Sequence, residues 1–204
     1  MLFDYLLESF GKNEPIFTSD ISYENYSDIW IKKELAKLCE CGQIIRYDRG
    51  IYYIPVKTPF GNSILNPSRI IERKYLSEKG NRIGFYTGIT ALQQAGLSTQ
   101  MSNIPEIQTN NENSKLRRVK VGNQEVILRK SRVKIDNDNI FVLQFLEMMN
   151  SISSGYFNDE RRAVIKNWIR KCNISQELVT KYAPFFPDKT MRNLIESGVI
   201  YYVA

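Results

Sequence analysis

The chain has 204 residues, of which 43% are hydrophobic and 25% are charged, the profile of a folded protein rather than of a disordered one. Lysine and arginine (28) outnumber aspartate and glutamate (22), and the net charge of +6 modestly favours anionic partners. Histidine is absent, which excludes histidine general bases, histidine-dependent nucleophiles and histidine-ligated metals.

Three cysteines, Cys39, Cys41 and Cys172, are too few for a four-cysteine zinc site and suggest no disulfide framework. We expect them to be packing groups in a reducing cytoplasm. The N-terminus lacks a signal-peptide pattern, and the longest apolar stretch, 140–146, is far shorter than the roughly 20 residues that span a bilayer. A cytoplasmic protein with no membrane partner is therefore predicted.

Residues 1–57 carry the pattern of a winged helix-turn-helix domain. Apolar spacing predicts a first helix at 2–10, and a short second helix is expected before a third at 27–42. Two short strands at 43–47 and 51–54 follow, separated by a turn. In this order of elements the third helix enters the major groove of DNA and the hairpin forms a wing.

The candidate DNA-contacting side chains belong to the third helix and the wing. They are Trp30, Lys32, Lys33, Lys37, Arg46 and Arg49. Residues 1–57 nevertheless hold 7 basic and 9 acidic side chains, a net charge of −2, so a DNA-binding domain here must place its charges on opposite faces. The alternative is a helical module whose lysines form a solvated face.

Proline, glycine and asparagine at 58–67 indicate a linker, and residues 68–204 then form a second, mixed α/β domain with a helical end. Its predicted helices lie at 68–79, 88–95, 138–152, 159–171, 175–183 and 188–197. Its predicted strands lie at 104–109, 116–121 and 125–134. Gly198 and the apolar residues after it repeat the order of helix, glycine and strand seen at 35–45. A second winged-helix-like segment that ends in a strand is therefore an alternative here. The predicted fold class is α+β.

The hairpin around Gly122-Asn123 is strongly basic, with eight cations against one acid, Glu125, a net charge of +7 within 115–134. The cations are Lys115, Arg117, Arg118, Lys120, Arg129, Lys130, Arg132 and Lys134. Two interpretations stay open: protection of a sheet edge, or a surface that binds phosphate or an acidic partner. In the second, Arg117, Arg129 and Arg132 are the preferred contacts, because guanidinium groups pair bidentately with phosphate or carboxylate.

Catalytic signatures are missing. The sequence has no P-loop and no glycine pattern for a dinucleotide, and Asp136 and Asp138 fit a polar turn better than a metal pair. We expect no enzymatic activity, no cofactor and no metal.

The stretch 35–55 resembles the N-terminal winged helix of the AbiEi family of antitoxins. The start of a helix at Ser68, the block Gly-Leu-Ser-Thr-Gln at 96–100 and the basic hairpin are also similar to that family, over roughly residues 1–150. The 96–100 block is the most specific part of the resemblance. From the residues alone we expect Gly96 and Leu97 to cap the preceding helix, and a direct contact of the block with a partner is the alternative.

The resemblance implies an antitoxin of a type IV toxin–antitoxin system, which acts in abortive infection as a phage defence. It implies a transcriptional repressor that binds the operator DNA of its own operon. It also implies a cognate nucleotidyltransferase-like toxin, which the C-terminal part counters without requiring a stable complex. From the residues alone, the alternative is an RNA- or protein-binding module that uses the 115–134 hairpin and has no antitoxin role.

Overall fold

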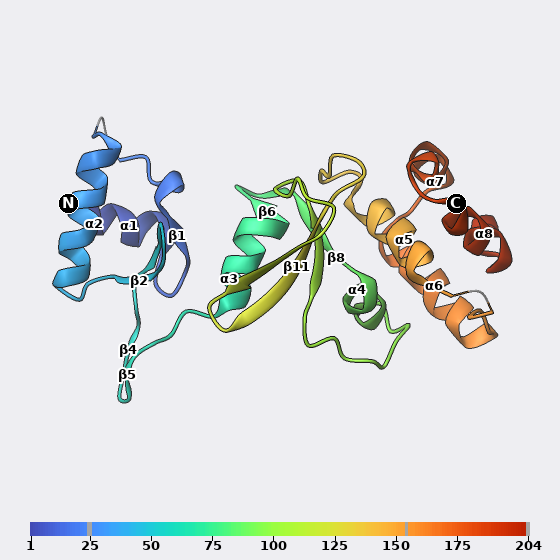
Figure 1. Ribbon diagram of the computed structural model, residues 1–204, viewed down its shortest axis with the longest axis horizontal. Coiled ribbons are helices and arrows are strands. Elements are labelled where there is room, and N and C mark those ends of the chain that lie inside the picture. The colour runs from blue at the N-terminus through green and yellow to red at the C-terminus, as the bar shows by residue number, and fades with distance from the viewer. Residues whose placement is uncertain (24–25, 154, 203–204) are drawn as a thin grey trace. The chain divides into compact units, whose positions relative to one another are not determined.

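The computed structural model describes residues 1–23, 26–153 and 155–202, and its α+β architecture confirms the predicted fold class (Figure 1). The chain forms two compact units: Met1–Arg73 with Val121–Asn123, called the N-terminal unit, and Lys74–Lys120 with Gln124–Ala204, called the C-terminal unit. The division falls after the segment 58–67 that the sequence marks as a linker. Whether residues 1–57 fold alone stays a prediction.

The N-terminal unit has the element order of a winged helix. Its elements are α1 (Leu2–Phe10), β1 (Ile16–Phe17), the 3-10 helix η1 (Thr18–Asp20), α2 (Asp28–Glu40), β2 (Ile45–Asp48) and β3 (Ile51–Tyr53). The three strands form an antiparallel sheet in the order β1-β3-β2. Leu6, Ile16 and Leu35 are fully buried in its core, so the apolar spacing of both helices predicts their inner faces correctly.

The segment predicted as a linker forms a small hairpin, β4 (Lys57–Thr58) and β5 (Gly61–Asn62), which extends away from α1 and α2 in Figure 1. Ser63 fixes its base: the Ser63 hydroxyl donates to Asn13 Oδ1 at 3.0 Å, and its carbonyl accepts from the Tyr53 hydroxyl at 3.0 Å. Phe60 at the tip is fully exposed.

The helix predicted at 68–79 is too long. Helix α3 (Pro67–Ile71) continues as a π-helical turn, η2 (Glu72–Leu76), and the chain then pairs as β6 (Ser77–Glu78) and β7 (Asn81–Arg82). Lys79 and Gly80 have positive φ angles of 48° and 84°, the backbone of a tight hairpin turn rather than of a helix.

The C-terminal unit contains a four-stranded sheet and a group of helices. Its strands β8 (Gly84–Thr87), β9 (Glu106–Thr109), β10 (Arg117–Val121) and β11 (Gln124–Lys130) lie in the order β10-β11-β9-β8. Strand β9 is parallel to β11 and antiparallel to β8. Strand β8 is absent from the sequence prediction. Its Gly84 is required by close approach, because a Cβ there would clash with the carbonyl oxygens of Tyr75 and Gln108.

The helices of this unit are α4 (Gly88–Gln94), α5 (Ile140–Ser151), α6 (Asp159–Lys171), α7 (Gln176–Tyr182) and α8 (Asp188–Glu196), with 3-10 helices η3 (Ala183–Phe185) and η4 (Val199–Tyr202). Helix α5 is buried on most sides, with Phe145, Leu146 and Met149 inaccessible to solvent. The strand considered after Gly198 is wrong, because these residues form η4 instead.

The cysteines are free thiols; Cys39 and Cys172 are half-buried, whereas Cys41 is exposed and is not the packing group that the sequence predicts. Burial raises the pKa of both Cys39 and Cys172 above the ordinary value of a thiol. Within the described part of the chain, no helix has the length and apolar character needed to cross a membrane.

Candidate nucleic-acid interface

The outer side of helix α2 carries the lysines that the sequence assigns to DNA. Ser27 caps the helix, its hydroxyl oxygen accepting a hydrogen bond of 3.4 Å from a backbone N–H of the first turn. Ile31 and Leu35 point into the core, with exposures of 4% and 0%. Lys32 and Lys33 therefore face solvent.

The third lysine of the helix is only partly available. Lys37 forms an ion pair with Glu34, three residues earlier on the helix. Exposed pairs of this kind are weak, but they reduce the charge that a partner meets. Lys32 and Lys33 have no ion-pair partner among the residues that the structure describes, so they are the stronger candidates.

Trp30 lies in an aromatic stack rather than on the lysine side. Its ring is stacked on that of Tyr26 with centroids 3.9 Å apart and an interplanar angle of 19°. It is half-buried and packs against the core of the N-terminal unit. This position fixes the first turn of α2, and a contact of Trp30 with DNA stays a prediction.

The wing presents two further cations. Arg46 is exposed on β2, and its Nε donates to the carbonyl of Asp48 at 3.4 Å. Arg49 is exposed in the turn, where its backbone N–H donates to Asp48 Oδ1 at 2.6 Å. The wing thus holds its backbone in a tight turn and leaves the Arg49 guanidinium facing solvent.

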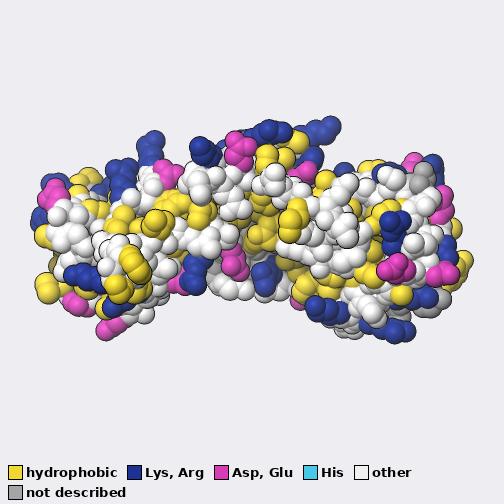
Figure 2. Space-filling view, turned by 90° about the horizontal axis from the view of Figure 1, so that it is seen from below, with side chains coloured by type: hydrophobic (Ala, Val, Ile, Leu, Met, Phe, Trp, Pro, Cys, Tyr) yellow, Lys and Arg dark blue, Asp and Glu magenta, His cyan; other side chains and the backbone are white. Residues whose placement is uncertain are grey.

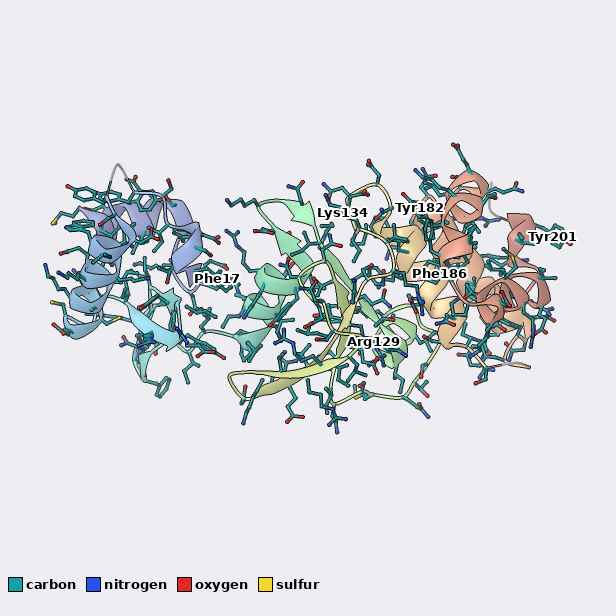
Figure 3. The ribbon with its side chains drawn as sticks, turned by 45° about the horizontal axis from the view of Figure 1, so that its top comes forward. Phe17, Arg129, Lys134, Tyr182, Phe186 and Tyr201 are labelled. Atoms are coloured by element: carbon teal, nitrogen blue, oxygen red, sulfur yellow. The ribbon has the colours of Figure 1, made fainter. Side chains whose placement is uncertain are left out.

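In the basic hairpin, the three arginines preferred as partner contacts are already paired within the protein. We call Arg117, Arg129 and Arg132 the paired arginines. Arg117 Nε lies 2.7 Å from Glu112, and Arg129 Nε lies 2.9 Å from Glu106 on the neighbouring strand β9. Figure 3 marks Arg129 on the sheet.

The Arg132 pair is anchored in the helical layer. Its Nε lies 2.8 Å from Glu147, a residue of the core helix α5 whose side chain is only 6% exposed. The guanidinium also lies 5.5 Å from the ring centre of Phe186. Asn150 donates to the other carboxylate oxygen of Glu147 at 3.3 Å. The charge of Arg132 is therefore used to satisfy a buried acid.

Glu112 is a second buried acid whose charge is balanced by an arginine of the hairpin. Burial by itself would raise the pKa of this carboxyl, whose side chain is 4% exposed. The hydrogen bond from the Ser114 backbone at 2.8 Å, together with the hydrogen bond and charge of Arg117, outweighs burial and holds the pKa below its ordinary value. Glu112 is thus ionised at neutral pH and neutralises Arg117.

Five cations of the hairpin region remain, and we call them the unpaired cations. They are Lys115, Arg118, Lys120, Lys130 and Lys134. All five are exposed, and none has an ion-pair partner among residues 1–23, 26–153 and 155–202. Lys134 lies in the loop before α5 (Figure 3). Cationic and acidic side chains are interspersed on the face of the molecule seen in Figure 2.

The Gly-Leu-Ser-Thr-Gln block ends helix α4, as expected. Gly96 has a φ of 76°, and the Leu97 backbone donates to the Leu92 carbonyl at 2.7 Å while the Leu97 side chain is buried. Residues 96–100 also line a pocket of about 540 Å³, and Arg161 is another of its lining residues. A direct contact of the block with a partner stays a prediction.

The acidic partners Glu106, Glu112 and Glu147 are what sequence reasoning missed. All three lie outside the basic window 115–134, and only Glu112 is close to it. The parallel pairing of β9 with β11 brings Glu106 beside Arg129. No local pattern signals that pairing. The described residues contain no cluster of three or more acidic or cysteine side chains that could hold a metal.

The chain belongs to DUF6088, a family of unknown function. The model of this family matches residues 5–176. No curated protein matches the sequence.

Proposed function

We propose that this DUF6088 protein is a DNA-binding autorepressor and the antitoxin of a type IV toxin–antitoxin system. The observation that carries the proposal is the placement of exposed Lys32 and Lys33 on helix α2, without an ion pair to any described residue, in a unit with winged-helix order. The similarity of residues 35–55 and 96–100 to AbiEi antitoxins supports the same assignment.

The DNA-binding step follows from the charges of the N-terminal unit. Its first 57 residues are acidic overall, so a nonspecific basic field does not drive binding. The lysines are instead concentrated on the solvent side of α2, and Arg49 projects from the wing turn. In this arrangement helix α2 would lie in the major groove and the wing would lie against the DNA backbone. Both elements would then contact phosphates.

The antitoxin step is assigned to the C-terminal unit. The unpaired cations are the part of the basic hairpin region that forms no ion pair within the described part of the chain. They suit the phosphates of a nucleic-acid substrate of the toxin, or an acidic surface of the toxin itself. Protection then needs only competition for that partner, and no stable complex of the two proteins.

Two measurements test the proposal. The full chain should retard DNA from upstream of its own gene in a gel-shift assay, and it should restore growth to cells that express a nucleotidyltransferase-like gene from the same locus. We expect the natural protein to retard the DNA and to rescue growth. We expect the double variant Lys32→Gln/Lys33→Gln not to retard the DNA. A folded chain that neither binds this DNA nor rescues growth would contradict the proposal. Binding to RNA alone would favour the RNA-binding alternative.

A further inference from the structure

Helix α2 exposes an isoleucine beside its lysines. Ile29 is 69% exposed, although Ile31, two residues later, is only 4% exposed. On a helix, residues three and four apart are neighbours, so Ile29 adjoins both Lys32 and Lys33. Ala36 continues the same exposed side. We call Ile29, Lys32, Lys33 and Ala36 the α2 face.

The start of this helix is held firmly, which gives Ile29 a defined position. Ser27 caps the first turn. Tyr26 and Trp30, which lie before and after Ile29 in the chain, stack on each other. Ile31 attaches the opposite side of the same turn to the core. A rigid presentation of an apolar side chain at the N-terminal end of a helix suits selective contact, because the ordering cost is already met in the free protein.

The composition of the α2 face matches the major groove of DNA. The N-terminal residues of a recognition helix contact base edges, and the C5-methyl group of thymine is the apolar group on the major-groove edge of a base pair. Lysines at positions 32 and 33 complement phosphates or guanine acceptors, and the small side chain of Ala36 allows a close approach.

We propose that Ile29 contacts the methyl group of a thymine in the operator and is a specificity-determining residue of this protein. The inference rests on the proposed DNA-binding function and adds which base feature the helix recognises. It assigns to Ile29 a role in sequence discrimination, whereas Lys32 and Lys33 supply affinity that depends on salt.

The test removes the methyl group without changing base pairing. After the operator has been located by footprinting, each thymine is replaced in turn by deoxyuridine, and affinity is measured with the full-length protein. One thymine in each bound site should matter, with a loss of about fourfold, the effect of one buried methyl group. Ile29→Ala should bind the natural operator more weakly, and the same deoxyuridine should cost it nothing further.

Phe60→Ala is the matched control, because Phe60 is a fully exposed apolar residue of the same unit outside α2. It should keep the sensitivity of the natural protein to deoxyuridine. Equal losses at the critical position for the natural protein and Ile29→Ala, or no sensitive thymine at all, would overturn the inference and leave DNA binding intact. Failure of the natural protein to bind any operator would defeat the proposed function and this inference together.

Discussion

Helix α2 and the basic hairpin region carry their positive charge in opposite ways. Helix α2 belongs to a segment with a net charge of −2, yet its Lys32 and Lys33 face solvent without ion-pair partners among the described residues. The hairpin segment has a net charge of +7, yet its three paired arginines are bound to carboxylates. The charge that a segment offers to a partner therefore depends on the pairs it makes within the fold.

The difference has a physical cause. Arginines of the hairpin region lie near Glu112 and Glu147, whose side chains are only 4% and 6% exposed. A buried carboxylate without a cation is costly, so the fold keeps a guanidinium at each. Lys32 and Lys33 of α2 form no ion pair with any residue that the structure describes, and they stay available. The predictions below on stability, on the pKa of Glu112 and on salt dependence test this contrast.

The largest effect should come from Arg132. Replacing it by Gln leaves the buried Glu147 without its cation and should lower the free energy of unfolding by about 3 kcal/mol, near the lower end for broken buried pairs because Arg132 itself is 39% exposed. Urea unfolding measures the change. Lys134→Gln is the control and should change the value by at most about 0.5 kcal/mol. Equal stability of the two variants would remove the distinction between paired and unpaired cations.

A second prediction concerns the boundary of the N-terminal unit. A fragment of residues 1–57 should be less stable than a fragment of residues 1–73 by about 2 kcal/mol, since the shorter one lacks the hydrogen bonds that Ser63 makes with Asn13, Tyr53 and Val56. Thermal unfolding followed by circular dichroism compares them. Equal melting temperatures would place the boundary back at 58–67.

The sequence predicts well what depends on local pattern. The apolar spacing of α1 and α2, the cap at Ser27 and the wing turn are all present. It fails where distant segments decide the structure. Strand β8 depends on the close approach of Gly84 to Gln108, and the pairing of Arg129 depends on the parallel contact of β9 with β11.

The candidate DNA interface divides along the same line. Exposure of Lys32 and Lys33 follows from helical periodicity, because the buried positions 31 and 35 fix the outer side. The position of Trp30 does not follow, since it depends on a stack with Tyr26. The unequal availability of the hairpin cations depends on Glu106, Glu112 and Glu147, which all lie outside residues 115–134.

The third prediction uses pH. The pKa of Glu112 is lower in the folded protein than its ordinary value of 4.5. Ionised Glu112 therefore stabilises the fold above pH 4.5, and this stabilisation is lost as the pH falls through the pKa of the folded state. Arg117→Gln should raise the pKa of Glu112 and weaken this dependence, at a cost of about 1 kcal/mol at neutral pH, since Arg117 is half exposed.

Carboxyl carbon chemical shifts of Glu112, followed by NMR between pH 6 and pH 2, report this pKa directly. Lys115→Gln is the control and should leave it in place, because Lys115 makes no pair with Glu112 in the described structure. An unchanged Glu112 pKa in Arg117→Gln would show that the backbone hydrogen bonds alone hold the charge.

The smallest effect separates the lysines of α2. Lys33→Ala should reduce the slope of operator affinity against salt concentration by about one unit, the loss of one phosphate contact. Lys37→Ala should reduce it less, because Glu34 already neutralises part of the charge of Lys37. Binding titrations at four salt concentrations would reveal the order. A larger change for Lys37 would contradict the assignment of Lys33 as the stronger contact.

The most direct test of two separate working surfaces measures repression and toxin rescue in the same cells. One full-length variant carries Lys32→Gln and Lys33→Gln; the other replaces the five unpaired cations by Gln. We predict that the first loses repression and keeps rescue, and that the second loses rescue and keeps repression. If the second variant rescued growth fully, or if each variant lost both activities while staying folded, the division of function between α2 and the hairpin region would be wrong.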